Sequence, residues 1–222
     1  MKGGPFSAGV IAAQGLDLVH VTLERPLPLD SGLSLAKRYV DAVGRPTSAI
    51  AGFELRIHEP MTPDSFDSFN RHYVEKLSDL GFVVDGIVPT ARTNVAPLAV
   101  GISEPSLYGL AYTVPTRRSD AAFLLSGVAE ARQGDYATML DSIMDVLSSR
   151  MSELGASWDD ATAIQLYGVE QVQSLVVNRV LTRVGRSASR GIRWFPSLPP
   201  VIGLNFEIDV RSAGTEIFLK AE

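Results

Sequence analysis

The chain has 222 residues, of which 45% are hydrophobic and 20% charged, so it can build a substantial core. The formal net charge is −5 and no basic cluster occurs, which argues against nucleic acid and anionic membranes as partners. The absence of cysteine excludes disulfides, thiolate catalysis, cysteine-ligated zinc and iron–sulfur clusters.

The N-terminal segment contains a short apolar patch, which is interrupted by Gln14 and Asp17. It therefore lacks the apolar length of a signal peptide or a membrane span. We expect a cytoplasmic protein without a membrane partner.

The first half alternates strand and helix patterns. Alternating apolar residues predict strands, and apolar stripes at three- and four-residue spacing predict helices. The predicted order is strand, helix, strand, helix, strand, strand, at 19–29, 33–44, 50–60, 62–81, 93–101 and 106–115. We expect Ser31 or Ser34 to cap the first helix and Gly44 to end it.

The second half follows the same plan. The predicted elements lie at 121–131, 135–155, 161–169, 171–185, 192–199 and 203–212, followed by a tail. An Asn-Arg dipeptide occurs at 70–71 and again at 178–179, in the second helix of each half. We therefore predict an α+β fold of two tandem units, 1–116 and 117–222, with helices packed on one face of a mixed sheet.

One stretch raises a chemical question. In VPTARTNVAPLAV (88–100), Arg92 lies between a proline turn and an apolar run that is typical of a buried strand. A charge at that position needs a partner, and a small anionic ligand is one candidate. Capping of the turn, or pairing with a neighbouring carboxylate, is the commoner role for a single arginine.

Four short motifs resemble those of the RidA/YjgF family of enamine and imine deaminases. They are a helix asparagine, a Pro-Ala-Arg turn, a Ser-Gly strand and an acidic last strand, and here they give Asn70, Arg92, Ser126 with Gly127, and Glu207. This turn carries an inserted Thr90. The resemblance implies chorismate-mutase-like β-α-β-α-β-β units, sites between neighbouring units, and a homo-oligomer with a homotrimer favoured.

The two halves contribute unequally to these motifs. The first half has Arg92 but no acidic residue in its last strand, whereas the second half has Ser126 and Glu207 but no Pro-Ala-Arg turn. A complete site would need residues from both halves. A second positive charge could come from Arg190 or Arg193, with Arg117 and Arg118 as alternatives.

The resemblance further implies deamination of a small carboxylate without a metal or an organic cofactor, with 2-aminomuconate-type dicarboxylates as the expected substrates. Arg92 would anchor a carboxylate, and Glu207 would handle the attacking water and the departing nitrogen. Ser126 and the Gly127 amide would hydrogen-bond substrate or water. Asn70 is a further candidate for substrate binding, although capping of local backbone is commoner.

Two other classes of function stay open. A ring-opening cyclic amide hydrolase would need a Ser–Lys pair, and no lysine has an obvious place beside Ser126. A non-catalytic metabolite-binding protein would keep the fold and lose the chemistry.

Histidines and aromatic side chains are two further kinds of candidate site residue. Three histidines, at positions 20, 58 and 72, lie too far apart in sequence to predict a metal site. Tyr108, Tyr112, Trp194 and Phe195 could line a planar substrate pocket, although core packing is commoner for such side chains.

Overall fold

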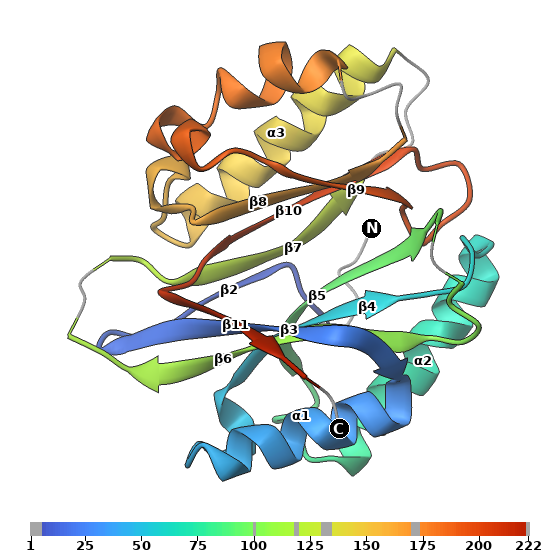
Figure 1. The fold of residues 1–222 in the computed structure, drawn as a ribbon, viewed down its shortest axis with the longest axis vertical. Helices are drawn as coiled ribbons and strands as arrows, with labels where there is room; N and C mark the ends of the chain where they lie inside the picture. The colour runs from blue at the N-terminus through green and yellow to red at the C-terminus, as the bar shows by residue number, and fades with distance from the viewer. Residues whose placement is uncertain (1–5, 100, 118–119, 130–134, 170–173, 221–222) are drawn as a thin grey trace.

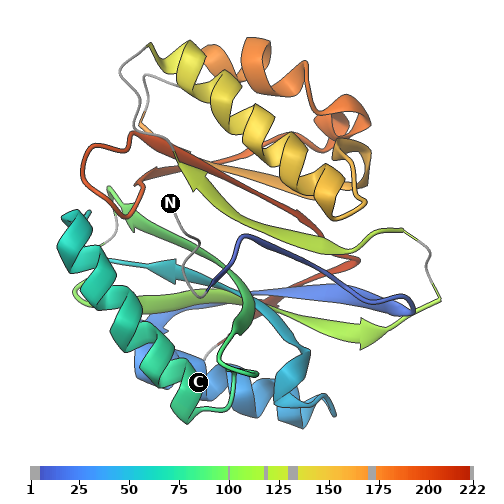
Figure 2. The ribbon, with the colours of Figure 1, turned by 180° about the vertical axis from the view of Figure 1, so that it is seen from behind.

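The computed structural model describes residues 6–99, 101–117, 120–129, 135–169 and 174–220. Two groups of strands face each other, and the helices lie on the outside of the pair (Figures 1 and 2). Helices α1 (Leu29–Ala42) and α2 (Pro63–Asp79) cover one group, and α3 (Tyr136–Glu153) covers the other. The predicted α+β class with a mixed sheet is confirmed.

The two halves of the chain show the same strand order. In the first half the order is β3-β6-β4-β5, and only β4 and β5 run parallel. In the second half it is β7-β10-β8-β9, and only β8 and β9 run parallel. The strands are β3 (Leu16–Pro28), β4 (Ile50–Arg56), β5 (Val88–Pro97), β6 (Ser106–Pro115), β7 (Phe123–Ala129), β8 (Ala163–Gly168), β9 (Arg193–Leu198) and β10 (Phe206–Ser212).

The chain ends connect the halves. The N-terminal strand β1 (Phe6–Ser7) pairs with β5, and β2 (Gly9–Ile11) pairs with β7. The C-terminal β11 (Thr215–Leu219) pairs in parallel with β3, so the segment expected only as a tail contains a strand. The N-terminal segment thus pairs with strands of both halves, and the C-terminal strand pairs with a strand of the first half. The unit boundary near residue 116, and the RidA-like identity of each unit, stay predictions.

Each half has its own apolar core between its sheet and its helices. In α3 the apolar stripe of Met139, Ile143, Leu147 and Met151 is buried on β7, β8 and β10. Full burial of one such side chain contributes about 1.5–3 kcal/mol, so these stripes fix the helices to the outer faces. No helix in the described ranges is long and apolar enough to cross a membrane.

A third cluster, of mostly small side chains, lies between the two sheets. Its members come from both halves: Leu18, Ala51, Ala91, Ala111, Ala122, Leu124 and Ala213. Alanines at these positions allow the two inner faces to approach closely. The inner faces therefore contact and cover each other within one chain.

The helix ends differ in part from the sequence prediction. Helix α1 begins after Pro28 with no side-chain cap, and the Ser31 hydroxyl donates to the Pro28 carbonyl, so the serine-cap prediction is wrong. Helix α2 is capped by Thr62 and α3 by Asp135, whose side chains accept backbone N–H bonds as expected for N-caps.

The fourth predicted helix, 171–185, is only partly represented. Residues 171–173 lie outside the described ranges, and the helical backbone that follows ends in the π-helical segment η3 (Val177–Leu181). The described residues also form three short 3-10 turns: η1 (Thr47–Ala49), η2 (Trp158–Asp160) and η4 (Gly185–Arg190).

Candidate functional site

A cavity of about 290 Å³ lies where β5 meets β7 and β10, beside the N-terminal segment. Its lining includes Arg92 from the first half and Ser126, Gly127 and Glu207 from the second. The structure therefore brings together four of the residues singled out by sequence, and both halves contribute to the lining, as expected. We call this cavity the Arg92 pocket.

Arg92 lies in the middle of β5, so its predicted place in a turn before the strand is wrong. The strand begins earlier because β1 pairs with it, aligning Ser7 with Ala91. The Arg92 guanidinium donates from Nη1 to Asn70 Oδ1 at 2.9 Å. Asn70, predicted to bind substrate, therefore holds the arginine, and it is not among the described residues that line the pocket.

Three aromatic rings of α2 surround the same guanidinium. The Arg92 Cζ atom lies 5.6, 5.8 and 5.0 Å from the ring centroids of Phe66, Phe69 and Tyr73. Burial lowers the pKa of Arg92 from its ordinary value, while Tyr73 and Glu207 act to raise it. Arginine starts from so high a pKa that the side chain stays cationic. The rings and Asn70 hold this cation in one orientation.

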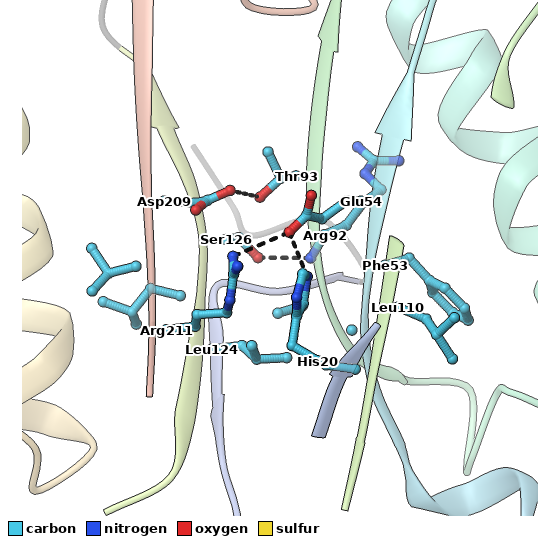
Figure 3. Close-up of a pocket in the computed structure, with 15 residues that line it drawn as sticks. His20, Phe53, Glu54, Arg92, Thr93, Leu110, Leu124, Ser126, Asp209 and Arg211 are labelled. Carbon is cyan, nitrogen blue, oxygen red and sulfur yellow. Dashed lines mark hydrogen bonds and ion pairs between the residues drawn. The ribbon is translucent and has the colours of Figure 1, made fainter. Parts of the chain in front are cut away.

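Ser126 connects three segments of backbone. Its hydroxyl oxygen accepts from the Arg92 backbone N–H at 3.0 Å, and the hydroxyl donates to the Ser7 carbonyl at 2.9 Å (Figure 3 shows the first contact). A serine hydroxyl has one proton, and here the Ser7 carbonyl takes it. Ser126 therefore fixes β7, β5 and β1 together, and its predicted substrate-binding role stays a prediction.

Gly127 provides the space that the Glu207 carboxyl group occupies. A Cβ atom added at Gly127 would lie 1.6 Å from Glu207 Oε1 and 2.3 Å from Cδ. The predicted role of the Gly127 amide, a hydrogen bond to substrate, stays a prediction. The structure shows that Gly127 leaves room for the Glu207 carboxyl group. Its lack of a side chain lets the carboxyl group lie directly against β7.

Glu207 is only 4% exposed. Burial, and secondly the neighbouring Asp209 carboxylate, raise its pKa to about 8. Arg92, Arg56 and a hydrogen bond from the Asn94 backbone N–H oppose that rise. The group is therefore mostly protonated at neutral pH, which is a suitable state for a general acid.

We expect Gly127→Ala to lower stability by roughly 1–3 kcal/mol and to reduce activity strongly, because the methyl group overlaps Glu207. Gly101→Ala is the matched control, since an added Cβ there meets nothing within 4 Å among the described residues. Urea unfolding of both variants measures the difference. Equal stabilities and wild-type turnover would show that Glu207 does not depend on this space.

Two further polar residues of the pocket were missed in the sequence. Arg150 is half-buried in the last turn of α3 and lines the pocket. In the sequence it lies beside the apolar stripe of that helix, and no motif marks it as a site residue. Asn94 follows Arg92 by two residues, on the same face of β5, and that spacing could have identified it. Asn94 is 3% exposed, and its amide N and O atoms have no hydrogen-bond partner within the described part of the chain.

The structure places the predicted sources of a second positive charge away from the Arg92 pocket, among those residues that it describes. Arg190 donates to the Ala161 carbonyl at 3.0 Å and so supports a turn. Arg193 is exposed, with its guanidinium 4.0 Å from Glu216. Arg117 is also exposed, and Arg118 lies outside the described residues. Of the arginines that the structure describes, only Arg92 and Arg150 line the pocket.

A buried polar network lies between the sheets, next to the pocket (Figure 3). Glu54 Oε1 receives contacts from His20 Nε2 at 2.9 Å, Gln165 Nε2 at 3.2 Å and Arg211 Nη1 at 3.3 Å. Burial opposes ionisation of Glu54, but His20 and Arg211 outweigh it and lower its pKa. Among the described residues, no group of acidic and histidine side chains is arranged to hold a metal ion.

Asp209 links this network to the pocket. It accepts from Thr93 Oγ1 at 2.8 Å and from the Tyr167 hydroxyl at 2.9 Å. Burial and the Glu54 charge raise its pKa. Since Asp209 in turn raises the pKa of Glu207, the network helps to keep the pocket acid protonated.

Comparison with known proteins adds to this geometry. Residues 1–217 match a family model described as 2-aminomuconate deaminase CnbZ. A 2-amino-5-chloromuconate deaminase from Comamonas testosteroni is 36% identical over 233 aligned residues, which cover 96% of this chain and 92% of that protein.

Two solved structures resemble the chain in fold. A chorismatase crystal structure aligns with a TM-score of 0.59 and 14% identity, over 95% of this chain and 78% of that one, and shows a likeness of fold alone. A cyanuric acid hydrolase aligns with a TM-score of 0.44 and 11% identity, over 91% and 69% of the two chains, which is too low to support an argument.

Proposed function

The chain belongs to the CnbZ family of 2-aminomuconate deaminases, and from this premise we propose that it hydrolyses a 2-aminomuconate-type enamine dicarboxylate to the 2-oxo acid and ammonia. We assign this activity to the Arg92 pocket, because it combines two arginines with one buried, protonated carboxyl group.

The two arginines fit the two carboxylates of such a substrate. The planar fork of Arg92, held by Asn70 and the rings of α2, suits bidentate pairing with the carboxylate next to the reacting carbon. Arg150 approaches from α3 and supplies the second positive charge. The volume of about 290 Å³ is close to that of small ligand sites and matches a six-carbon dicarboxylate.

Glu207 supplies the proton transfers in the proposed mechanism. Its protonated form donates to the enamine carbon, which converts the enamine into an iminium ion. The resulting carboxylate takes a proton from a water molecule as that water adds to the iminium carbon. The same proton then passes to the nitrogen. The hydroxyl group of this adduct returns its proton to the Glu207 carboxylate as the C=O bond forms and ammonia leaves, which restores the protonated acid. Substrate and water thus give the 2-oxo acid and ammonia, with no redox change and no cofactor.

The neighbouring cation assists this chemistry. Arg92, paired with the adjacent carboxylate, withdraws electron density from the reacting carbon and favours water addition. Asn94 offers one donor and one acceptor group beside it, which suits hydrogen bonding to the amino group or to the attacking water. Ser126 does not act as a nucleophile here, since its hydroxyl donates to backbone, and the ring-opening hydrolase alternative gains no support.

The direct test is ammonia release from freshly generated 2-aminomuconate, with loss of substrate ultraviolet absorbance followed in parallel. We expect turnover well above the spontaneous rate. The chlorinated analogue, 2-amino-5-chloromuconate, should be compared at equal concentration to define the preferred substrate. Absence of turnover on both compounds and on simpler 2-imino acids would refute the proposed activity.

We expect Arg150→Met to raise KM by about 10- to 100-fold with a smaller change in kcat, because it removes one charged hydrogen bond to the distal carboxylate. Arg193→Met is the matched control, because that exposed arginine does not line the pocket. Steady-state kinetics of both variants provide the measurement. An effect confined to Arg193→Met would instead support the sequence prediction that Arg193 supplies the second positive charge.

We also propose a cytoplasmic homo-oligomer, with a homotrimer favoured, and a distant relationship of each half to the RidA/YjgF fold. The edge strand β11 supports association, since it carries Phe218 at 64% exposure. Light scattering after gel filtration measures the number of chains.

A further inference from the structure

A second cavity, of about 420 Å³, lies where β9 meets β3 and β6. The Arg92 pocket lies where β5 meets β7 and β10, and the strand orders of the two halves make β5 the counterpart of β9. The two cavities thus occupy corresponding positions with the halves exchanged. They share no lining residue among those that the structure describes. We call the second one the Arg56 cavity.

Arg56, at the end of β4, is its buried cation. The side chain is 4% exposed and lies among three aromatic rings. Its Cζ atom is 4.0 Å from the ring centroid of Tyr108, 5.5 Å from that of Tyr167 and 5.8 Å from that of Phe195. Tyr167 and Phe195 stack on each other, with centroids 5.2 Å apart. Such walls suit a flat ligand.

The hydrogen bonding of this guanidinium is incomplete. Nη1 donates to the Leu55 carbonyl at 2.9 Å, whereas Nη2 has no hydrogen-bond acceptor among the described residues. Its ionic partner Glu54 Oε2 lies 3.6 Å away, and Glu54 is shared with Arg211 and His20. A buried donor without an acceptor costs about 1–3 kcal/mol, which a bound carboxylate would offset.

We propose that the Arg56 cavity is a second ligand site, which binds a small planar aromatic monocarboxylate. The carboxylate would accept from the Arg56 guanidinium, and the ring would pack against Tyr108 and Phe195. Glu54 offsets part of the Arg56 charge, and the exposed Glu24 and Arg25 of the lining add one charge of each sign. This balance favours a singly charged ligand over a dicarboxylate or a phosphate. The site shares no described lining residue with the Arg92 pocket, and Arg56 acts on Glu207 there only through its charge.

The test uses 4-fluorobenzoate as the probe and ligand-observed fluorine NMR as the readout. Wild type is compared with Arg92→Met, Arg56→Met and Ala99→Trp. Ala99 is an exposed residue that lines the cavity, so the indole obstructs it without removing a buried group. Urea unfolding of each variant accompanies the titrations. Because binding is measured, the result does not depend on any turnover.

We expect wild type and Arg92→Met to bind the probe with a Kd below about 1 mM. Arg56→Met and Ala99→Trp should each weaken binding at least about tenfold, which would be a change of about 1.4 kcal/mol. Loss of binding only in Arg92→Met would place the probe in the first pocket and overturn the proposal. Undiminished binding by Ala99→Trp, or no binding by wild type at about 10 mM, would also overturn it. Ala99→Trp decides the case if Arg56→Met does not fold.

Discussion

Glu207→Gln is expected to lower kcat by about 10²–10⁴-fold, because the amide keeps the shape of the side chain but cannot transfer protons. Gln still occupies the space over Gly127, so substrate binding should change little. Ammonia release under saturating substrate is the measurement. Glu75→Gln, which alters an exposed carboxylate on α2, is the matched control and should keep wild-type activity.

The pKa of Glu207 gives the same variant a second, independent signature. With a pKa of about 8, the acid form is present at neutral pH and is lost as the pH rises through that value. Wild-type kcat/KM should therefore fall above about pH 8, since the first step needs the protonated group. A pH–rate profile that rises through this range would contradict the role of Glu207 as the initial acid.

The stability of the wild-type fold should also fall with rising pH, over a range that begins below the one in which activity falls. In the unfolded chain Glu207 ionises near its ordinary pKa of 4.5, whereas in the folded chain it holds its proton up to about 8. A carboxyl group with a raised pKa therefore destabilises the fold as the pH rises between these values. The full rise corresponds to an upper bound of roughly 4–5 kcal/mol.

Glu207→Gln removes that destabilising ionisation. We expect the variant to be more stable than wild type at about pH 9 and to differ little at about pH 5, where both side chains are neutral. Urea unfolding at the two pH values measures this, with Glu75→Gln as the control. A variant that is less stable than wild type at the higher pH would show that the carboxylate is well stabilised by Arg92.

Much of the fold could be predicted because long elements carry strong patterns. The strand at 106–115 and the helix at 135–155 lie within two residues of the observed β6 and α3. The errors fall on short segments whose structure depends on a distant partner. β1, β2 and β11 have two to five residues each and pair with strands far away in sequence. No local pattern indicates such pairing.

The site was predictable where a motif carried it and not where packing created it. The motifs gave Arg92 and Glu207, which the fold does bring into one pocket. Arg190 and Arg193 lie in the sequence region that corresponds to the Pro-Ala-Arg turn, but η4 and β9 direct their side chains away from the pocket. Arg150 was missed because only the docking of α3 on its sheet brings it to the pocket. The polar network likewise depends on two sheets meeting.

The largest loss of activity is expected for Arg92→Ala, with kcat/KM reduced by about 10³–10⁴-fold. The variant loses a bidentate ion pair and the charge that activates the reacting carbon, two effects of about 2–3 kcal/mol each. Steady-state ammonia release gives the value. A reduction of less than about tenfold would exclude Arg92 as the substrate anchor.

Two companion variants separate charge from orientation at this position. Arg92→Lys keeps the charge but loses the planar fork, so we expect a loss of about 10²-fold, between wild type and Arg92→Ala. Asn70→Ala keeps the arginine but removes the acceptor that orients Nη1 at 2.9 Å. If Asn70 positions the fork, its loss should reduce kcat/KM by about tenfold in wild type and much less in the Arg92→Lys background. Equal losses in both backgrounds would instead mean that Asn70 acts independently, as substrate binding would require.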